Sequence, residues 1–100
     1  MPHVISRKKL RDHWEIHPDT EEPLATWFKT AEKAEWASFA DVRKTFGKTV
    51  DRVQECYIFD VHGGHCRVIC RVSPTWATMF IIHVLTHREY DRGAWKKDCC

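Results

Sequence analysis

Hydrophobic residues in the first half of the chain recur at the spacing of an α-helix. Between residues 19 and 35 they follow an i, i+3, i+4, i+7 pattern that places them along one helical face: Leu24, Trp27, Phe28, Ala31 and Ala34. A similar pattern predicts a helix over residues 7–16, which Pro18 ends, and a shorter one over residues 39–46, which Gly47 ends. The first half of the chain is therefore predicted to be helical.

Small polar residues stand where these helices are predicted to begin. Ser6 and Ser38 precede the first and third helices as expected N-caps. Asp19, followed three residues later by Glu22, has the spacing of a capping box for the second helix. Ahead of the first helix, residues 3–5 are predicted to form a short strand.

The hydrophobic period changes to two in the second half of the chain. Residues 56–61 and 66–73 alternate as strands do, and the Gly-Gly pair within residues 62–65 is typical of a tight hairpin turn. A turn at residues 74–76 leads to a third long strand over residues 77–85. Helices followed by hairpins predict an α+β fold, a single domain over the whole chain, with the helices on one face of an antiparallel sheet.

The strand at residues 66–73 is predicted to have two different faces, because side chains alternate along a strand. One face is small and apolar and suits contact with helices: Cys66, Val68, Cys70 and Val72. The other face carries Arg67, Ile69 and Arg71, which places two guanidinium groups on the side of the sheet that the helices leave uncovered. These arginines are either solvated charges or part of an anion-binding surface.

Composition narrows the class of protein. The chain has 100 residues, 43% hydrophobic and 30% charged, without an apolar run long enough to span a membrane or a signal-peptide pattern at its start. We therefore expect a cytoplasmic protein without membrane contact, with its five cysteines reduced. The last 40 residues hold six lysines and arginines against three acids, so a polyanion would prefer that end.

A metal site is a possible alternative in the hairpin, where His62, His65, Cys66 and Cys70 lie close together in the sequence. Cys66 and Cys70 are four residues apart on an extended strand, about 13 Å, whereas zinc ligands converge on one ion. We therefore expect no metal and no cofactor.

The cysteines are expected to be structural or inert. Cys56, Cys66 and Cys70 alternate with other strand residues and read as small buried hydrophobic side chains. Cys99 and Cys100 are adjacent at a chain end that we expect to be frayed, and a disulfide between neighbours would be strained.

The segment FIIHVLTHREYDR, residues 80–92, joins an apolar strand to a dense polar cluster. Thr86 is expected to cap a short helix that begins at His87, which places His87 and Tyr90 on one side of it. A lone histidine is most often structural, but this one is followed by Arg88, Tyr90 and Arg92. Together they offer a proton carrier, a phenol and cations for phosphate.

At these residues the chain resembles the HigB toxins of bacterial toxin–antitoxin pairs, within the RelE/ParE superfamily. The resemblance covers nearly the whole chain, from HVISRKKLRDHWEIHPD through AEWASFADVRKTF and FDVHGGHCRVI to IIHVLTHREYD, its most specific part. It implies a RelE-like fold and an mRNA endonuclease that enters the ribosomal A site. It also implies a HigA-type antitoxin partner with a helix-turn-helix domain, through which alone the toxin would reach promoter DNA.

The resemblance also assigns roles to residues, without metal. RelE-like toxins activate the ribose 2′-hydroxyl to attack the neighbouring phosphate. By position, His87 would carry the proton, Tyr90 would assist it, and Arg67 would hold the scissile phosphate. Further RNA contacts are expected from basic residues near these positions: Arg71, His83, Arg88, Arg92 and Lys48.

Two other functions fit the same fold. One is a ParE-like toxin that acts on a protein target such as gyrase, and the other is a non-catalytic module that binds RNA through its basic sheet. The His-Arg-x-Tyr segment favours the nuclease, because a pure binder needs cations but no proton carrier beside a phenol.

Overall fold

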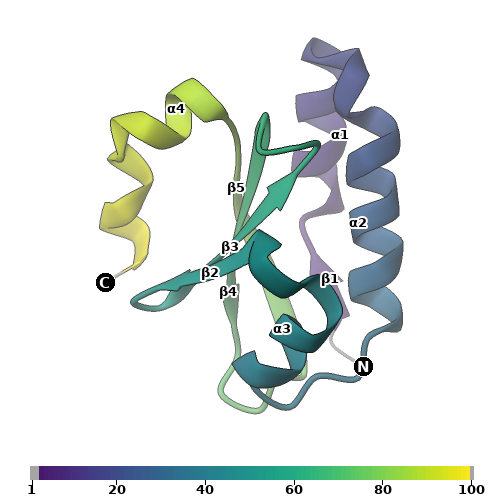
Figure 1. The fold of residues 1–100 in the computed structure, drawn as a ribbon, viewed down its shortest axis with the longest axis vertical. Coiled ribbons are helices and arrows are strands. Elements are labelled where there is room, and N and C mark those ends of the chain that lie inside the picture. The colour runs from purple at the N-terminus through teal and green to yellow at the C-terminus, as the bar shows by residue number, and fades with distance from the viewer. Residues whose placement is uncertain (1–2, 100) are drawn as a thin grey trace.

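A five-stranded mixed sheet, with strand order β1-β5-β4-β3-β2, forms the centre of the protein in the computed structural model, which describes residues 3–99. Helices α1 and α2 cover one side of this sheet, and α4 and the chain end lie on the other (Figure 1). The strands are β1 His3–Ile5, β2 Val50–Val53, β3 Cys56–Val61, β4 Cys66–Val72 and β5 Thr78–Thr86. The helices are α1 Arg7–Ile16, α2 Glu21–Lys33, α3 Phe39–Phe46 and α4 His87–Arg92, with 3₁₀ turns η1 Pro18–Thr20, η2 Gly47–Thr49 and η3 Ala94–Cys99. The α+β class is confirmed.

The main core lies between helices α1–α3 and one face of the sheet. It contains Leu10, Leu24 and Val42 from the helices, packed with Val68 and Cys70 from β4, all with no exposed surface. Burial of this apolar surface is the main force that holds the layers together. The predicted inward face of residues 66–73 is confirmed.

The β3–β4 hairpin is fixed by its turn and its register. Gly63 and Gly64 both have positive φ, 64° and 87°, which the tight turn requires and glycine adopts at little cost. Val61 then pairs with Cys66, and every pair down to Cys56 and Arg71 follows in antiparallel register.

The sheet differs from the expected one at both edges. Residues 50–53, predicted as no element, form β2, because Val50 is fully buried opposite Phe59 and Val53 packs against a second, smaller core. β1 runs parallel to β5, so the sheet is mixed rather than wholly antiparallel.

The predicted helix caps are wrong at three of four sites in the described chain. Ser6 has φ +76°, which is outside the extended region that an N-cap adopts, and its side chain makes no cap bond. Ser38 is extended, but the Asp41 carboxylate accepts the nearby hydrogen bond, from the Ala37 amide at 2.8 Å. Asp19 lies inside η1, so α2 starts two residues later without a capping box.

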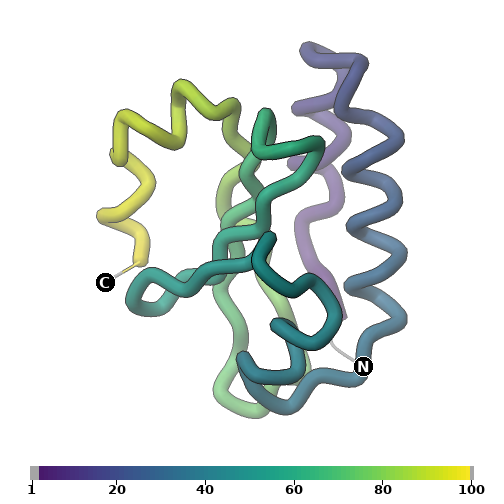
Figure 2. The backbone as a smooth tube through the Cα atoms, in the orientation of Figure 1, coloured from purple at the N-terminus to yellow at the C-terminus, as the bar shows by residue number. Residues whose placement is uncertain are grey.

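The outer face of the sheet, expected to be open, is covered by the C-terminal segment. Trp95 and Cys99 of η3 are buried against Cys56, Ile58 and Ile69, forming a second, smaller core. The chain end returns to the β2–β3 turn (Figure 2), where the Glu55 amide donates to the Cys99 carbonyl at 3.0 Å. The end is not frayed, because it covers apolar side chains that water would otherwise contact.

A disulfide joins Cys56 to Cys99, with 5.2 Å between the two Cα atoms. The expectation that all cysteines are reduced is therefore wrong for this pair, while Cys66 and Cys70 are free and buried as expected. Cys100 lies outside the described residues. Within residues 3–99 no helix has the length and apolar character to cross a membrane.

Candidate active site

The polar cluster after β5 is organised by a capping box at the start of α4. The Thr86 hydroxyl accepts from the Glu89 amide at 3.1 Å, and the Glu89 carboxylate accepts from the Thr86 amide at 2.9 Å. These reciprocal bonds satisfy two backbone donors that a helix start leaves free. The predicted cap is confirmed, and it fixes His87 as the first residue of α4.

Arg67 is the centre of the cluster. Its Nη1 lies 3.0 Å from Asp60 Oδ1, and its Nη2 lies 3.4 Å from His87 Nδ1. Its guanidinium carbon sits 4.6 Å from the ring centre of Tyr90, a cation–π contact. The three residues predicted to act together, one on β4 and two on α4, therefore meet at one point.

The contacts of Arg67 leave little of it open. Its side chain is only 15% exposed, and its Nε also donates to the Gly64 carbonyl at 3.4 Å. Asp60 is directly opposite Arg67 in the β3–β4 register, so the ion pair is set by the hairpin. Burial raises the pKa of the Asp60 carboxyl, and the positive charge of Arg67 opposes that rise.

The two ring nitrogens of His87 have different partners. Nε2 lies 3.1 Å from Asp91 Oδ2, one helical turn ahead, and Nδ1 faces Arg67. A guanidinium can only donate, so a hydrogen bond between the two requires the tautomer in which Nδ1 accepts and Nε2 carries the proton. The His87 side chain is well exposed, at 59%.

Tyr90 is held from its other side by Trp95. The two rings stack with centres 5.1 Å apart and planes within 11°. The Trp95 indole N–H donates to the Tyr90 carbonyl at 2.9 Å. Trp95, Asp60 and Asp91 thus support the predicted residues, and none of these three was singled out from the sequence.

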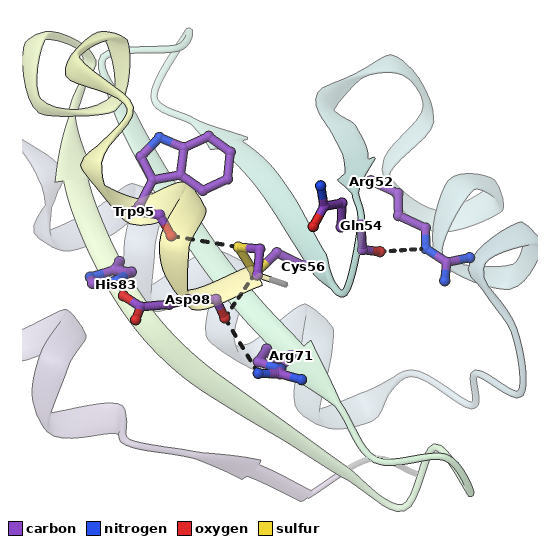
Figure 3. The surroundings of a disulfide bond; sticks show 8 residues. Arg52, Gln54, Cys56, Arg71, His83, Trp95 and Asp98 are labelled. Atoms are coloured by element: carbon purple, nitrogen blue, oxygen red, sulfur yellow. Dashed lines mark hydrogen bonds and ion pairs between the residues drawn. A yellow bond between two sulfur atoms is a disulfide. The ribbon is translucent and has the colours of Figure 1, made fainter.

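Arg71 and His83 do not join this cluster. Both bind Asp98 of η3: His83 Nε2 lies 2.7 Å from its carboxylate, and Arg71 Nη1 donates to its carbonyl at 3.3 Å (Figure 3). With Lys9, Lys97 and Asp98 they line a separate pocket of about 510 Å³.

The remaining basic residues predicted to bind RNA lie at the margin. Arg88 and Arg92 are exposed on α4, the helix that also carries His87 and Tyr90. Lys48 is exposed in η2, just before β2. Val50, the first residue of β2, pairs with Phe59, which precedes Asp60 in β3. All three flank the cluster, on elements adjacent to it.

The residues considered as metal ligands are dispersed. The His62 ring lies 3.3 Å from the Asp19 carboxylate and 5.6 Å, centre to centre, from the His65 ring. Cys66 and Cys70 are buried in the main core, and burial raises the pKa of the Cys66 thiol to about 12. Among residues 3–99 no group of three or more His, Cys, Asp or Glu side chains is placed to hold a metal ion.

Comparison with known proteins shows the family of the chain. The family model for HigB toxins, described as the RelE-like toxic component of a toxin–antitoxin system, matches residues 20–93. The chain is 28% identical over 92 residues to the mRNA interferase toxin HigB of Escherichia coli strain K12, which covers 89% of this chain and 88% of that protein. Proteins named mRNA interferase HigB from Escherichia coli O157:H7 and Shigella flexneri match at the same identity and coverage. The matched span includes the whole Arg67 cluster, and this chain belongs to the HigB toxin family.

Proposed function

We propose that this protein is an mRNA interferase, an endoribonuclease that arrests translation by cutting messages on the ribosome. The observation that carries the proposal is the contact of the Arg67 guanidinium with the His87 imidazole and the Tyr90 ring. Membership of the HigB family and the names of three similar proteins support the same activity. The class of substrate is single-stranded message RNA.

The proposed reaction uses the RNA's own 2′-hydroxyl. His87 takes the proton from this hydroxyl as its oxygen attacks the adjacent phosphorus, and the bond to the 5′-oxygen of the next nucleotide breaks. Arg67 stabilises the extra negative charge of the phosphorane, and Tyr90 assists proton transfer to the leaving oxygen. The products are a 2′,3′-cyclic phosphate and a 5′-hydroxyl.

The entry of a phosphate would rearrange the contacts of Arg67. The Arg67–His87 contact, at 3.4 Å, is long for a hydrogen bond and is easily replaced. A phosphate oxygen between them would accept from Arg67 and free the Nδ1 lone pair of His87 for the 2′-hydroxyl. Asp60 would keep the guanidinium in place through Nη1, because that ion pair is the shorter contact.

The family implies an antitoxin partner. We propose that it is of the HigA type, with a helix-turn-helix domain, and that the toxin reaches promoter DNA only through it. The ribosome, with message in its A site, would be the second partner. Arg88, Arg92 and Lys48 are exposed beside the cluster and are the proposed contacts to RNA outside the scissile step.

The test is expression of the chain alone. Growth should stop through loss of translation, and mapping of RNA ends should place cuts inside coding regions. His87→Ala serves as the control, because it keeps the basic face and removes the proton carrier. Continued translation with collapse of DNA supercoiling would instead support a gyrase-directed toxin.

The chemistry has its own test in a purified ribosome assay. New 3′ ends should carry a cyclic phosphate, detectable because these ends resist ligation until the ring is opened and the remaining phosphate is removed. Cleavage should persist with a zinc-specific chelator that leaves the ribosomes functional. Loss of cleavage under chelation would contradict the proposed mechanism and redirect attention to His62, His65 and Cys66.

A further inference from the structure

The segment 94–99 is attached to the outer face of the sheet by three different kinds of contact. The Cys56–Cys99 disulfide fixes its end covalently. Trp95 is buried, 3% exposed, in the second core. Asp98 binds His83 and Arg71 (Figure 3). This segment lies beyond residue 93, where the match to the HigB family model ends.

Trp95 connects this attachment to the candidate active site. One ring face of Tyr90 is stacked on Trp95, and the guanidinium of Arg67 lies over the Tyr90 ring. The indole N–H also holds the backbone carbonyl of Tyr90. Because α4 has only six residues and buries none of them, its orientation depends on what lies beneath it.

We propose that Trp95 is a positioning residue for Tyr90 and Arg67, and that the Cys56–Cys99 disulfide is a redox-sensitive latch that keeps it in place. The inference rests on the proposed nuclease function. With the latch closed, the guanidinium and phenol are held for catalysis. With the latch open, the segment is attached only by non-covalent contacts, and the catalytic groups are less ordered.

The redox step is thiol–disulfide exchange. A thiolate of a dithiol reductant attacks one sulfur of the Cys56–Cys99 bond and forms a mixed disulfide, and its second thiol resolves it. Two electrons and two protons pass to the protein, leaving two thiols, while the reductant becomes a disulfide. Closure runs the same exchange backwards with a disulfide oxidant. A more oxidising environment therefore favours the ordered, active toxin.

The first test is substitution of Trp95, with cleavage measured on ribosome-bound message. Trp95→Ala should lower kcat by roughly 10²-fold, the order expected when a catalytic group is displaced by about 1 Å, with KM little changed. Trp95→Phe keeps a ring for Tyr90 to stack on and should recover most of the rate. Trp36→Ala is the matched control, since Trp36 is also buried but lies in the main core, where it contacts Phe46 and Thr45 of α3.

Thermal melting must show that each variant is folded at the assay temperature. Equal kcat for folded Trp95→Ala and wild type would overturn the role of Trp95. If Trp95→Ala does not fold, Trp95→Phe and the redox test below decide. A loss in Trp36→Ala as large as that in Trp95→Ala would show a general effect of destabilisation and would also overturn it.

The second test concerns the latch. Treatment of wild type with a dithiol should lower kcat by about 10-fold or more, towards the value for Trp95→Ala, in line with loosened positioning. Cys56→Ser should show the same low rate and no further response to the dithiol. Cys100→Ser retains both latch cysteines and should respond as wild type does. An unchanged rate on reduction would overturn the latch.

A readout without RNA separates this inference from the nuclease proposal. The indole N–H of Trp95 and the Nε–H of Arg67 give nuclear magnetic resonance signals whose positions report the stack and the guanidinium environment. Both should shift on reduction in wild type and not in Cys56→Ser. If they shift while wild type cuts no RNA, the latch stands and the proposed function fails. If wild type cuts RNA but neither the two signals nor the cleavage rate changes on reduction, the proposed function stands and the latch fails.

Discussion

The Arg67 guanidinium contacts several groups of the protein in the absence of RNA. Asp60 takes one nitrogen, His87 and the Gly64 carbonyl take the others, and Tyr90 covers its face. A cation arranged in this way is preorganised, because it does not need to fold into place when charge develops on the phosphorane. The same contacts keep the side chain largely out of water.

Substitution of His87 and Arg67 should separate proton transfer from charge stabilisation. His87→Ala should leave ribosome binding intact and reduce the cleavage rate by about 10²–10⁴-fold, the usual worth of general acid–base catalysis. Arg67→Ala should reduce it by about 10²–10³-fold, by analogy with removal of one oxyanion donor. Rates and ribosome affinity are measured separately, after melting confirms folding, because the Arg67 stem is part of the packed surface.

A folded His87→Ala protein that cuts at the wild-type rate would remove the centre of the proposal. Arg92→Ala is a suitable control, since Arg92 is an exposed residue of the same helix and is not among the contacts of Arg67 described above. It should change affinity for RNA rather than the rate of the chemical step.

The candidate catalytic residues could be singled out from the sequence, but most of the residues that contact them could not. The placement of His87 and Tyr90 on one side of a short helix was predicted from two local features: the Thr86 cap and the three-residue spacing between them. The contact of Asp60 could have been predicted, since the Gly-Gly turn fixes a register that places Asp60 opposite Arg67. The contact of Trp95 with Tyr90 could not, because it depends on the chain turning back after Gly93 to cover the outer face.

At the scale of elements, α4 depends on its capping box. The Thr86 amide donates to the Glu89 carboxylate, and this bond lowers the pKa of Glu89 below its ordinary value of 4.5, against a smaller effect of burial. A carboxyl whose pKa is lower in the folded state adds stability above pH 4.5, and that stability is lost as pH falls through the folded pKa.

Comparison with Glu89→Gln should reveal this contribution. Glutamine can accept the same hydrogen bond without a charge, so the contribution of its capping box to the free energy of unfolding should not depend on pH. Wild type should be the more stable protein at pH 6, and the difference should shrink as the pH falls below about 4.5 and then vanish. Urea unfolding of both proteins between pH 3 and pH 6 measures it. A constant difference across this range would contradict the assigned cause.

The elements themselves illustrate where sequence patterns are informative. The amphipathic helices and alternating strands were predicted with nearly correct bounds, because their pattern reflects burial on one face. β2 was missed, since its two valines, Val50 and Val53, do not alternate with polar residues at a period of two, and pairing with β3 holds the strand in place. Ser6 and Ser38 failed as caps because backbone angle and the nearby Asp41, not residue type, decide which group takes the bond.

The whole molecule has two apolar cores, one on each face of the sheet. The larger one could be predicted, because several helices carry apolar stripes directed at it. The smaller one could not, since its cover is a six-residue segment with only Trp95 and Cys99 buried. Its closure by a disulfide was excluded from the sequence because Cys99 was compared with its neighbour Cys100, not with Cys56, 43 residues away.

The disulfide should contribute to global stability as well as to the site. It closes a loop over a sequence separation of 43 residues, which contains β3, β4, β5 and α4, so it restricts the unfolded chain. Cross-links of this kind typically add about 2–4 kcal/mol to the free energy of unfolding. A domain of this size has about 5–15 kcal/mol in total, so the reduced protein should remain folded but melt earlier.

Denaturant unfolding of wild type with and without a dithiol measures this contribution directly. Cys99→Ser should match reduced wild type and should not respond to the dithiol. Cys100→Ser, with the latch intact, should match oxidised wild type. If reduction leaves the unfolding midpoint of wild type unchanged, then Cys56 and Cys99 are not joined in solution. The segment 94–99 would then be held on the sheet by Trp95 and Asp98 alone.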